Sequence, residues 1–513
     1  MINLKIPAAA VVAVALMAAF SGCGAGSQGK KDNQTFVVAT IGGPASLDPT
    51  LTNDQASSEI MKQVYDTLVD QDFDTLEPVP ALAESWRFEN DENGLPTKLR
   101  MFLRGGVVFH NGDEFTARDV KFNLDRAATS PHISHIAGEI ASTEVVGDLE
   151  VLITLHAPFI PILNNLAHTA MSMVNERAVR EMGDDYARNP VGTGPMKFVN
   201  WVVGNRIELT RWDRYWGPAP QIKDLTVRYI TDDATRLLEL ETGGVDMVVD
   251  VPPQEVARIE ANPNLKLYRA PSLTLHYIGF NTRKPPFDDV RIRRAIAHAI
   301  DMNSLVKTVF MGTGSPGRGP LGSMVWASAA GLLPMPEYNP AKARELLAEA
   351  GYPDGFSLTL STNDNAQRID TSVIVQGMLA AVGIHVEIEI VEWAAYLEML
   401  DSGGHDLFLL GWITVTGDPD LGLEIFHSRS FEPGGNYTFF GDPEVDRLLD
   451  AARGETDVDL RRQMYIDAQQ IIHAASPMIY TLEGEVLVAA RSNVEGFRIN
   501  PAQHHPYWTV RLE

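Results

Sequence analysis

Short apolar runs alternate with amphipathic segments along the chain from Thr35 onward. Residues 36–40 form a continuous apolar run typical of a buried strand, and 99–103 and 151–155 also fit strands. Between the first two of these, the pattern predicts a helix around 57–68. The alternation predicts an α/β protein whose sheets are covered by helices on both faces.

Capping residues mark the ends of further helices. Asn339 is a favourable N-cap before Pro340, and Gly351 suits the left-handed position after the helix. Another helix is expected after Asp289, with its apolar residues on one face. Helices followed by strands are predicted at 233–241 with 245–249, 373–381 with 385–390, and 394–400 with 407–410.

The first residues of the chain are typical of an exported protein. One positive charge precedes an apolar stretch at 8–20, which is shorter than the roughly 20 residues that a membrane-spanning helix needs. The small residues before Cys23 resemble a lipobox, with Phe20 where leucine is usual. We therefore expect a signal peptide at 1–22 and a lipidated Cys23 opening a flexible spacer, 23–33. The alternative is a plain secretory signal followed by an incidental cysteine.

Composition narrows the classes of partner. The 42 Lys and Arg residues stand against 67 Asp and Glu residues, a net charge of −25, which disfavours nucleic acid and anionic lipid headgroups. Contact with a membrane is therefore expected through the lipid anchor only. Cys23 is the sole cysteine, so neither disulfides nor a thiolate metal site are available. Stability must come from burying apolar surface, which a chain of this length can do.

Signals for catalysis, cofactors or metals are weak. Residues 312–317 match G-x-G-x-x-G by letter, but a helix is expected before them, and prolines disfavour a helix after them. We expect a loop there and no nucleotide site. His504 and His505 are expected to be a solvated pair rather than metal ligands. Without a nucleophile–base signature, the sequence favours a protein that is not an enzyme and holds no cofactor and no metal.

Ordered motifs along the chain point to one family. The segments are 46–49, 64–68, 80–86, 108–120, 192–195, 277–282, 290–295, 339–351 and 476–477. Together they resemble the family-5 extracytoplasmic solute-binding proteins of ABC importers, the group that binds dipeptides, oligopeptides, glutathione and nickel. The resemblance covers essentially the whole mature chain.

The resemblance implies a two-lobed periplasmic-binding-protein clamshell of class II, cluster C. Lobe I would comprise 34–78, 192–282 and a C-terminal return at 483–513, with an inserted subdomain at 79–191; lobe II would comprise 283–482. Such a protein closes on a solute and docks on a membrane permease with its ATPase subunits. We expect a monomer tethered outside the cytoplasm, at the outer face of the cytoplasmic membrane or in the periplasm.

Trp412 and the residues after it are the most informative for the solute. Dipeptide and oligopeptide binders carry an aspartate three residues after this tryptophan, to pair the ligand's ammonium; here that position is Val415. The hydroxyls of Thr414 and Thr416 resemble the glutathione-binding version. Arg368 could hold a carboxylate, since its planar fork offers two donors.

Four further residues are candidate ligand contacts by the same resemblance. Asn363 shares its segment with Arg368, and Asn281 ends a strand that crosses between lobes. Asn53 and Asp54 follow the first strand's loop, where Asp54 could replace the lost ammonium partner. Asp418 is expected instead to form a turn before Pro419.

The sequence thus predicts a substrate-binding lipoprotein for a peptide-like solute, either an oligopeptide or a glutathione-like molecule. An oligosaccharide or another organic solute is the alternative within this class. A secreted α/β hydrolase and a sensory or adhesive surface lipoprotein are the alternatives outside it.

Overall fold

The computed structural model describes residues 34–52, 54–431 and 435–513. The predicted signal peptide, Cys23 and its spacer, and Asn53 lie outside the described residues. Within the described part of the chain, no helix has the length and apolar character to cross a bilayer.

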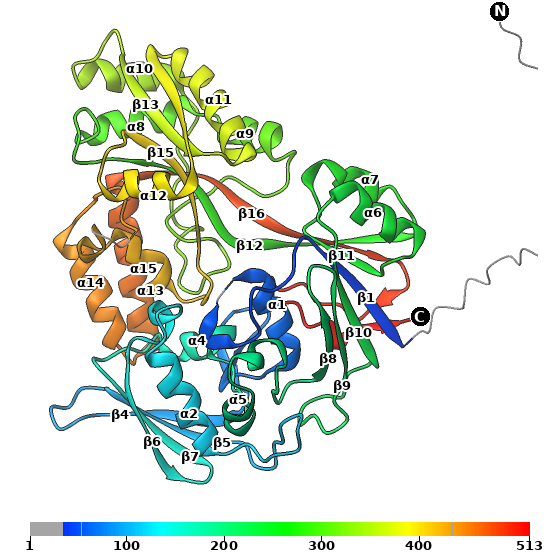
Figure 1. Ribbon diagram of the computed structural model, residues 1–513. Helices are drawn as coiled ribbons and strands as arrows, with labels where there is room; N and C mark the ends of the chain where they lie inside the picture. The colour runs from blue at the N-terminus through cyan, green and yellow to red at the C-terminus, as the bar shows by residue number, and fades with distance from the viewer. Residues whose placement is uncertain (1–33, 53, 432–434) are drawn as a thin grey trace, which may run out of the picture.

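A ten-stranded sheet runs through the molecule (Figure 1). Its strands, in spatial order, are β14 (Ile384–Val391), β13 (Phe356–Asn363), β15 (Leu407–Ile413), β12 (Leu265–Phe280), β16 (Met478–Arg491), β11 (Met247–Val249), β1 (Thr35–Thr40), β10 (Asp224–Tyr229), β9 (Arg206–Arg211) and β8 (Met196–Val202). We call β13–β15 with their helices the β15 half, and β1 and β8–β11 with theirs the β1 half.

The two halves are joined by β12 and β16, which pair antiparallel along most of their length. Their register shifts between Pro271 and Leu275, and again between His276 and Tyr277. Unpaired residues interrupt the ladder and allow a sheet to bend. β12 pairs with β15 of the β15 half from Thr274 onward, while β16 pairs with β11 of the β1 half from Val488 onward, so the irregularity lies where the paired strands pass from one half to the other.

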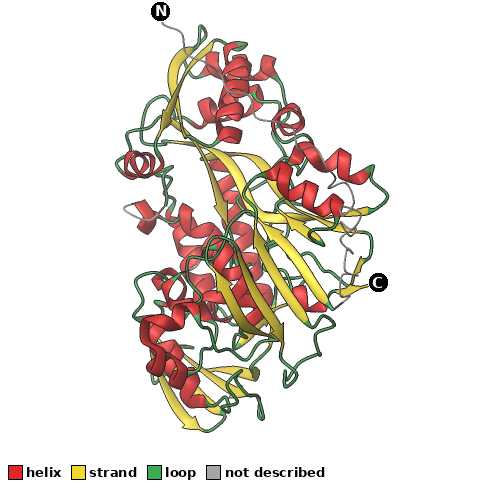
Figure 2. Ribbon diagram, turned by 45° about the vertical axis from the view of Figure 1, so that its right-hand side comes forward, coloured by secondary structure: helices red, strands yellow, loops and turns green. Residues whose placement is uncertain are grey.

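Helices cover both faces of the sheet in each half (Figure 2), as the alternating pattern predicted. Alternate residues of β1 explain this: Phe36 and Val38 pack toward α1 (Gln55–Val64), while Ala39 packs toward α6 (Asp233–Thr242) and α7 (Val256–Glu260). The β15 half is covered by α8 (Val290–Ala299), α9 (Met302–Val309), α10 (Pro340–Glu349), α11 (Ala366–Ala380), α12 (Trp393–Asp401), α13 (Pro419–Leu423), α14 (Pro443–Gly454) and α15 (Val458–Ala475).

A separate four-stranded sheet, which we call the inserted sheet, lies beside α13 and α15 (Figure 1). Its order is β4 (Ala83–Glu89), β5 (Lys98–Leu103), β7 (Glu150–Leu155) and β6 (Ile140–Gly147). It has its own hydrophobic core with α2 (Ala117–Ala128), α3 (Ser134–Ala137) and α4 (Ile162–Leu166). The hairpin β2 (Val69–Gln71) and β3 (Pro78–Pro80) leads into it, and α5 (Glu176–Met182) leads out; β17 (Val494–Glu495) pairs with β18 (Arg511–Leu512) near the C-terminus.

Most predicted elements are confirmed, with shifted boundaries. The helix expected around 57–68 ends at Val64, whose carbonyl accepts a hydrogen bond from Gly194 N at 2.9 Å while Tyr65 turns extended. The helix expected from residue 373 begins at Ala366, capped by Asn365, which accepts from Arg368 N at 3.1 Å. The G-x-G-x-x-G segment is a loop after α9, as expected.

The prediction of a solvated histidine pair is wrong. His505 is 1% exposed, and its carbonyl accepts from Gln63 Nε2 at 2.8 Å while its Nδ1 accepts from Asn500 N at 3.1 Å. His504 is half-buried, with its ring 6.2 Å from that of His168. The C-terminal segment packs against α1, and burial lowers the pKa of His505 to about 3.

Candidate functional site

Strands β10, β1 and β11 are neighbours and run parallel, so their carboxyl ends meet at one edge of the sheet. Ile41 follows β1 and Asp250 follows β11 at this edge. Open α/β sheets bind ligands beyond the carboxyl ends of their strands. The edge faces the β15 half across a cavity.

This cavity has a volume of about 540 Å³, within the range of small-ligand sites. Its walls come from both halves. The β1 half contributes Ile41, Asp233 and Asp250, and the β15 half contributes Phe310, Thr313 and Gln367. The joining strands β12 and β16 supply His276 and Glu485. A molecule bound here would contact both halves at once.

The three acidic side chains around the cavity differ in their partners. Asp233 pairs with Arg236 at 2.7 Å, and Glu485 pairs with Arg269 at 2.7 Å. The carboxylate of Asp250 forms neither a hydrogen bond nor an ion pair with any other residue that the structure describes. Burial raises its pKa from the usual value, partly offset by the nearby charge of Arg236.

Arg368 follows the lining residue Gln367 on α11, and its charge acts on the lining residue His276, although Arg368 does not itself border the cavity. Its Nη1 donates to Asn363 Oδ1 at 2.8 Å, and its guanidinium lies 5.9 Å from the ring centroid of Trp393. It forms no ion pair with a carboxylate of the described residues, and burial lowers its pKa. Burial, and secondly the nearby charge of Arg368, lowers the pKa of His276 to about 4. Two residues predicted from sequence, Arg368 and Asn363, are thus brought together.

The segment after β15 is largely enclosed. Thr414 and Thr416 are 4% and 2% exposed, and Val415 is half-buried. Trp412 is also half-buried, packs partly into a hydrophobic core and donates from Nε1 to Leu421 O at 3.2 Å. These residues form a wall of the β15 half, but none of them borders the 540 Å³ cavity.

The side chains of Asn281 and Asp54 both bind main-chain groups of the fold. The amide of Asn281 donates to the carbonyls of Gly403 and His405, each at 3.1 Å. Asp54 caps α1 by accepting from Ser57 N at 2.9 Å. Neither residue borders the cavity between the halves.

The region of the inserted sheet contacts the β15 half through main-chain carbonyls. Arg453 O accepts from Ile160 N at 2.7 Å. Thr416 O accepts from Gln71 Nε2 at 2.5 Å and from Asn164 Nδ2 at 3.2 Å. Gly417 follows with φ +69°, and a Cβ there would lie 3.0 Å from Leu76 Cβ. Glycine therefore permits both the turn and the close approach.

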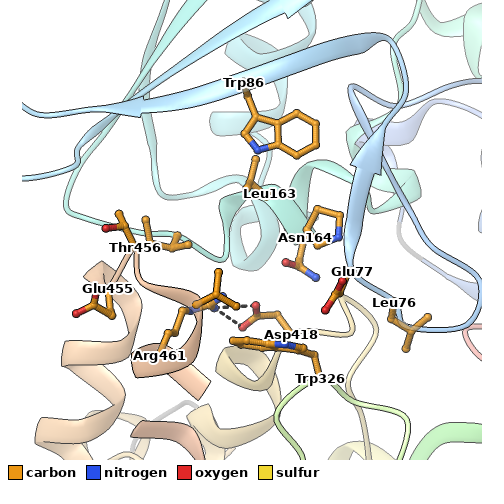
Figure 3. Close-up of a pocket in the computed structure, with 13 residues that line it drawn as sticks. Leu76, Glu77, Trp86, Leu163, Asn164, Trp326, Asp418, Glu455, Thr456 and Arg461 are labelled. Carbon is orange, nitrogen blue, oxygen red and sulfur yellow. Dashed lines mark hydrogen bonds and ion pairs between the residues drawn. The ribbon is translucent and has the colours of Figure 1, made fainter. Parts of the chain in front are cut away.

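A second cavity of about 260 Å³ lies beside this contact (Figure 3). Trp86 and Leu163 approach from the side of the inserted sheet, while Trp326 lies on the other side, next to the ion pair of Arg461 with Asp418. Arg461 Nη2 donates to both carboxylate oxygens of Asp418, at 2.8 and 2.7 Å, and both side chains are buried.

The turn predicted at Asp418 is confirmed, and the same side chain also forms a buried ion pair that the sequence did not reveal. Its carboxylate accepts from Asp420 N at 2.9 Å and so caps α13. The ion pair with Arg461 joins positions 43 residues apart, and no local pattern signals it. Nearby, burial raises the pKa of Asp420 to about 6, although Arg453 opposes the shift.

Sequence reasoning missed Asp250, His276 and Gln367. Asp250 directly follows the strand predicted at 245–249, so the carboxyl-end rule was the one signal that could have found it. Within the described ranges, no group of three His, Cys, Asp or Glu residues could hold a metal ion.

Comparison with known proteins defines the class. The model of bacterial extracellular solute-binding proteins, family 5 (middle), matches residues 77–432. The chain belongs to this family, which comprises extracytoplasmic solute-binding proteins and not enzymes.

The relatives and solved structures agree with this assignment. The chain is 36% identical over 480 residues to the glutathione-binding protein GsiB of Pectobacterium atrosepticum, covering 91% of each, and 35% identical over 479 residues to GsiB of Salmonella typhimurium, covering 91% and 92%. It superposes on HbpA2 of Haemophilus parasuis with a TM-score of 0.86 and 29% identity, covering 93% and 100%. It superposes on DppA of Helicobacter pylori, solved in complex with the peptide STSA, with a TM-score of 0.75 and 30% identity, covering 93% of this chain and 98% of DppA. The predicted fold class, a mixed α/β periplasmic-binding-protein fold of cluster C, is confirmed.

Proposed function

We propose that this protein captures a peptide-like solute, with glutathione as the leading candidate, and delivers it to an ABC importer. The observation that carries the proposal is the 540 Å³ cavity whose walls come from both halves of the fold. The names of its relatives support the solute class, since two of them are glutathione-binding proteins and one was solved with a bound peptide.

Capture follows from lobe closure. We place lobe I at 34–78, 192–282 and 483–513, the inserted subdomain at 79–191, and lobe II at 283–482. A solute that contacts both lobes binds the closed form more tightly than the open form and shifts the population toward closure. The closed form would then dock on the permease and its ATPase subunits.

The proposed contacts distinguish this cleft from that of a simple dipeptide binder. Val415 offers no charge for an ammonium group, and an unpaired buried ammonium is costly. Arg368, supported by Asn363, would hold a carboxylate of the solute. Trp412, Thr414, Thr416, Asn281, Asn53 and Asp54 remain proposed contacts or wall residues from the family resemblance.

The tether also remains a proposal. Lipidation of Cys23 would hold a monomer at the outer face of the cytoplasmic membrane or in the periplasm. Anchoring would raise its effective concentration near the permease.

Native purification followed by mass spectrometry of the released solute tests the solute class. Isothermal titration calorimetry with reduced glutathione, a tetrapeptide and maltotriose then ranks the candidates. Glutathione or the peptide should bind one per chain without turnover. Preference for maltotriose would refute the peptide class, and time-dependent cleavage of ligand would refute a binding role.

A further inference from the structure

Two oppositely charged side chains without an ion-pair partner among the described residues lie at the cavity and beside it: Asp250 is one of its lining residues, and Arg368 lies close enough to the lining residue His276 for its charge to lower the pKa of that histidine. Asp250 belongs to the β1 half, while Arg368 adjoins the lining residue Gln367 on the β15 half. Building on the proposed function, we infer that Asp250 receives the cationic amino group of the solute while Arg368 receives a carboxylate. The site would thus select solutes that carry both charges.

The surroundings of Asp250 leave its carboxylate free for this role. The charge of Arg236 acts on Asp250, but Arg236 Nη2 donates to Asp233 Oδ1 at 2.7 Å and to the main-chain carbonyl of Asp250 at 3.2 Å. Its Nη1 donates to Ile230 O at 2.9 Å. Arg236 therefore holds the backbone of Asp250, which has φ +55°, and not its side chain.

No other lining group offers the same chemistry. The other two carboxylates that line the cavity are already paired, Glu485 with Arg269 and Asp233 with Arg236. The residues that line the cavity from the β15 half, Phe310, Thr313 and Gln367, carry no acid. An ammonium group that enters the cavity would lose hydrogen bonds to water. Asp250 is the carboxylate able to compensate for this loss with a charge-assisted hydrogen bond.

The experiment compares two ligands on three proteins. Calorimetry measures reduced glutathione and amino-acetylated glutathione, which lacks the cationic group, on the wild type, Asp250→Asn and the control Glu485→Gln. Asparagine is nearly isosteric and tolerates a left-handed backbone, so the fold should persist. Thermal melting and circular dichroism check this.

We expect Asp250→Asn to weaken glutathione binding at least tenfold and to change binding of the acetylated ligand less than threefold. Acetylation should weaken binding to the wild type at least tenfold, and Glu485→Gln should bind both ligands within threefold of the wild type.

Equal binding of glutathione by the wild type and Asp250→Asn would overturn the inference, as would equal losses for both ligands or equal binding of both ligands by the wild type. In those cases the proposed function stands. Failure of the wild type to bind glutathione or any peptide would instead refute the proposed solute class, and the inference with it.

Discussion

The carbonyl of Thr416 connects the β15 half to the region of the inserted sheet, and removing its two hydrogen bonds tests whether this contact favours lobe closure. Gln71 and Asn164 both donate to it from the side of the inserted sheet. If lobe opening separates the inserted sheet from the β15 half, both bonds exist only in the closed form. Replacing Gln71 and Asn164 by alanine should therefore favour opening without touching the solute.

The magnitude follows from the number of bonds. A neutral hydrogen bond contributes about 1 kcal/mol net, so two contribute about 2 kcal/mol to closure. At about 1.4 kcal/mol per tenfold, the double variant should bind its solute up to roughly 30-fold more weakly, and each single variant roughly fivefold.

Calorimetry gives the affinity, and small-angle X-ray scattering gives the open fraction without solute. Tryptophan fluorescence is a local reporter, since Trp86 and Trp326 line the second cavity from its two sides (Figure 3). Asn165→Ala is the matched control, because Asn165 adjoins Asn164 but donates to Ile136 O within the region of the inserted sheet, at 2.9 Å. A double variant with wild-type affinity and scattering would refute the reasoning, as would an equal loss in Asn165→Ala.

Two further predictions concern stability. Asp418→Asn should lower the free energy of unfolding by about 3–5 kcal/mol, because it leaves the buried Arg461 unpaired. Urea unfolding measures this loss. The control is Asp74→Asn, which breaks the exposed ion pair with Arg498 and should lower the free energy of unfolding by less than about 1 kcal/mol. Burial raises the pKa of Glu59 to about 8, despite the hydrogen bond that it accepts from Tyr507. Folded Glu59 therefore keeps a proton that the unfolded chain releases near pH 4.5. The contribution of Glu59 to the free energy of unfolding consequently falls as the pH rises between those two values. Glu59→Gln should therefore gain stability over the wild type by up to about 1.4 kcal/mol per pH unit in that window, and parallel stability curves would contradict the assignment.

Local signals were reliable where a short segment decides its own conformation. The N-cap of α10 at Asn339 and the left-handed Gly351 were predicted correctly because capping depends on residues a few positions apart. The end of α1 was misjudged because a distant partner, Gly194, takes the carbonyl of Val64. His505 was misjudged for the same reason, since α1 buries it from 442 residues away.

By itself the sequence determined the family, the alternation of strands and helices, and the absence of an acid at Val415. These features are carried by residue type and local order. The tertiary structure alone decided which distant groups meet. Thr416 meets Gln71 and Asn164, which are 345 and 252 residues away, and Asp250 lines one cavity together with His276 and Gln367. Burial and charge pairing depend on neighbours in space, and chain order does not specify those neighbours until the lobes pack.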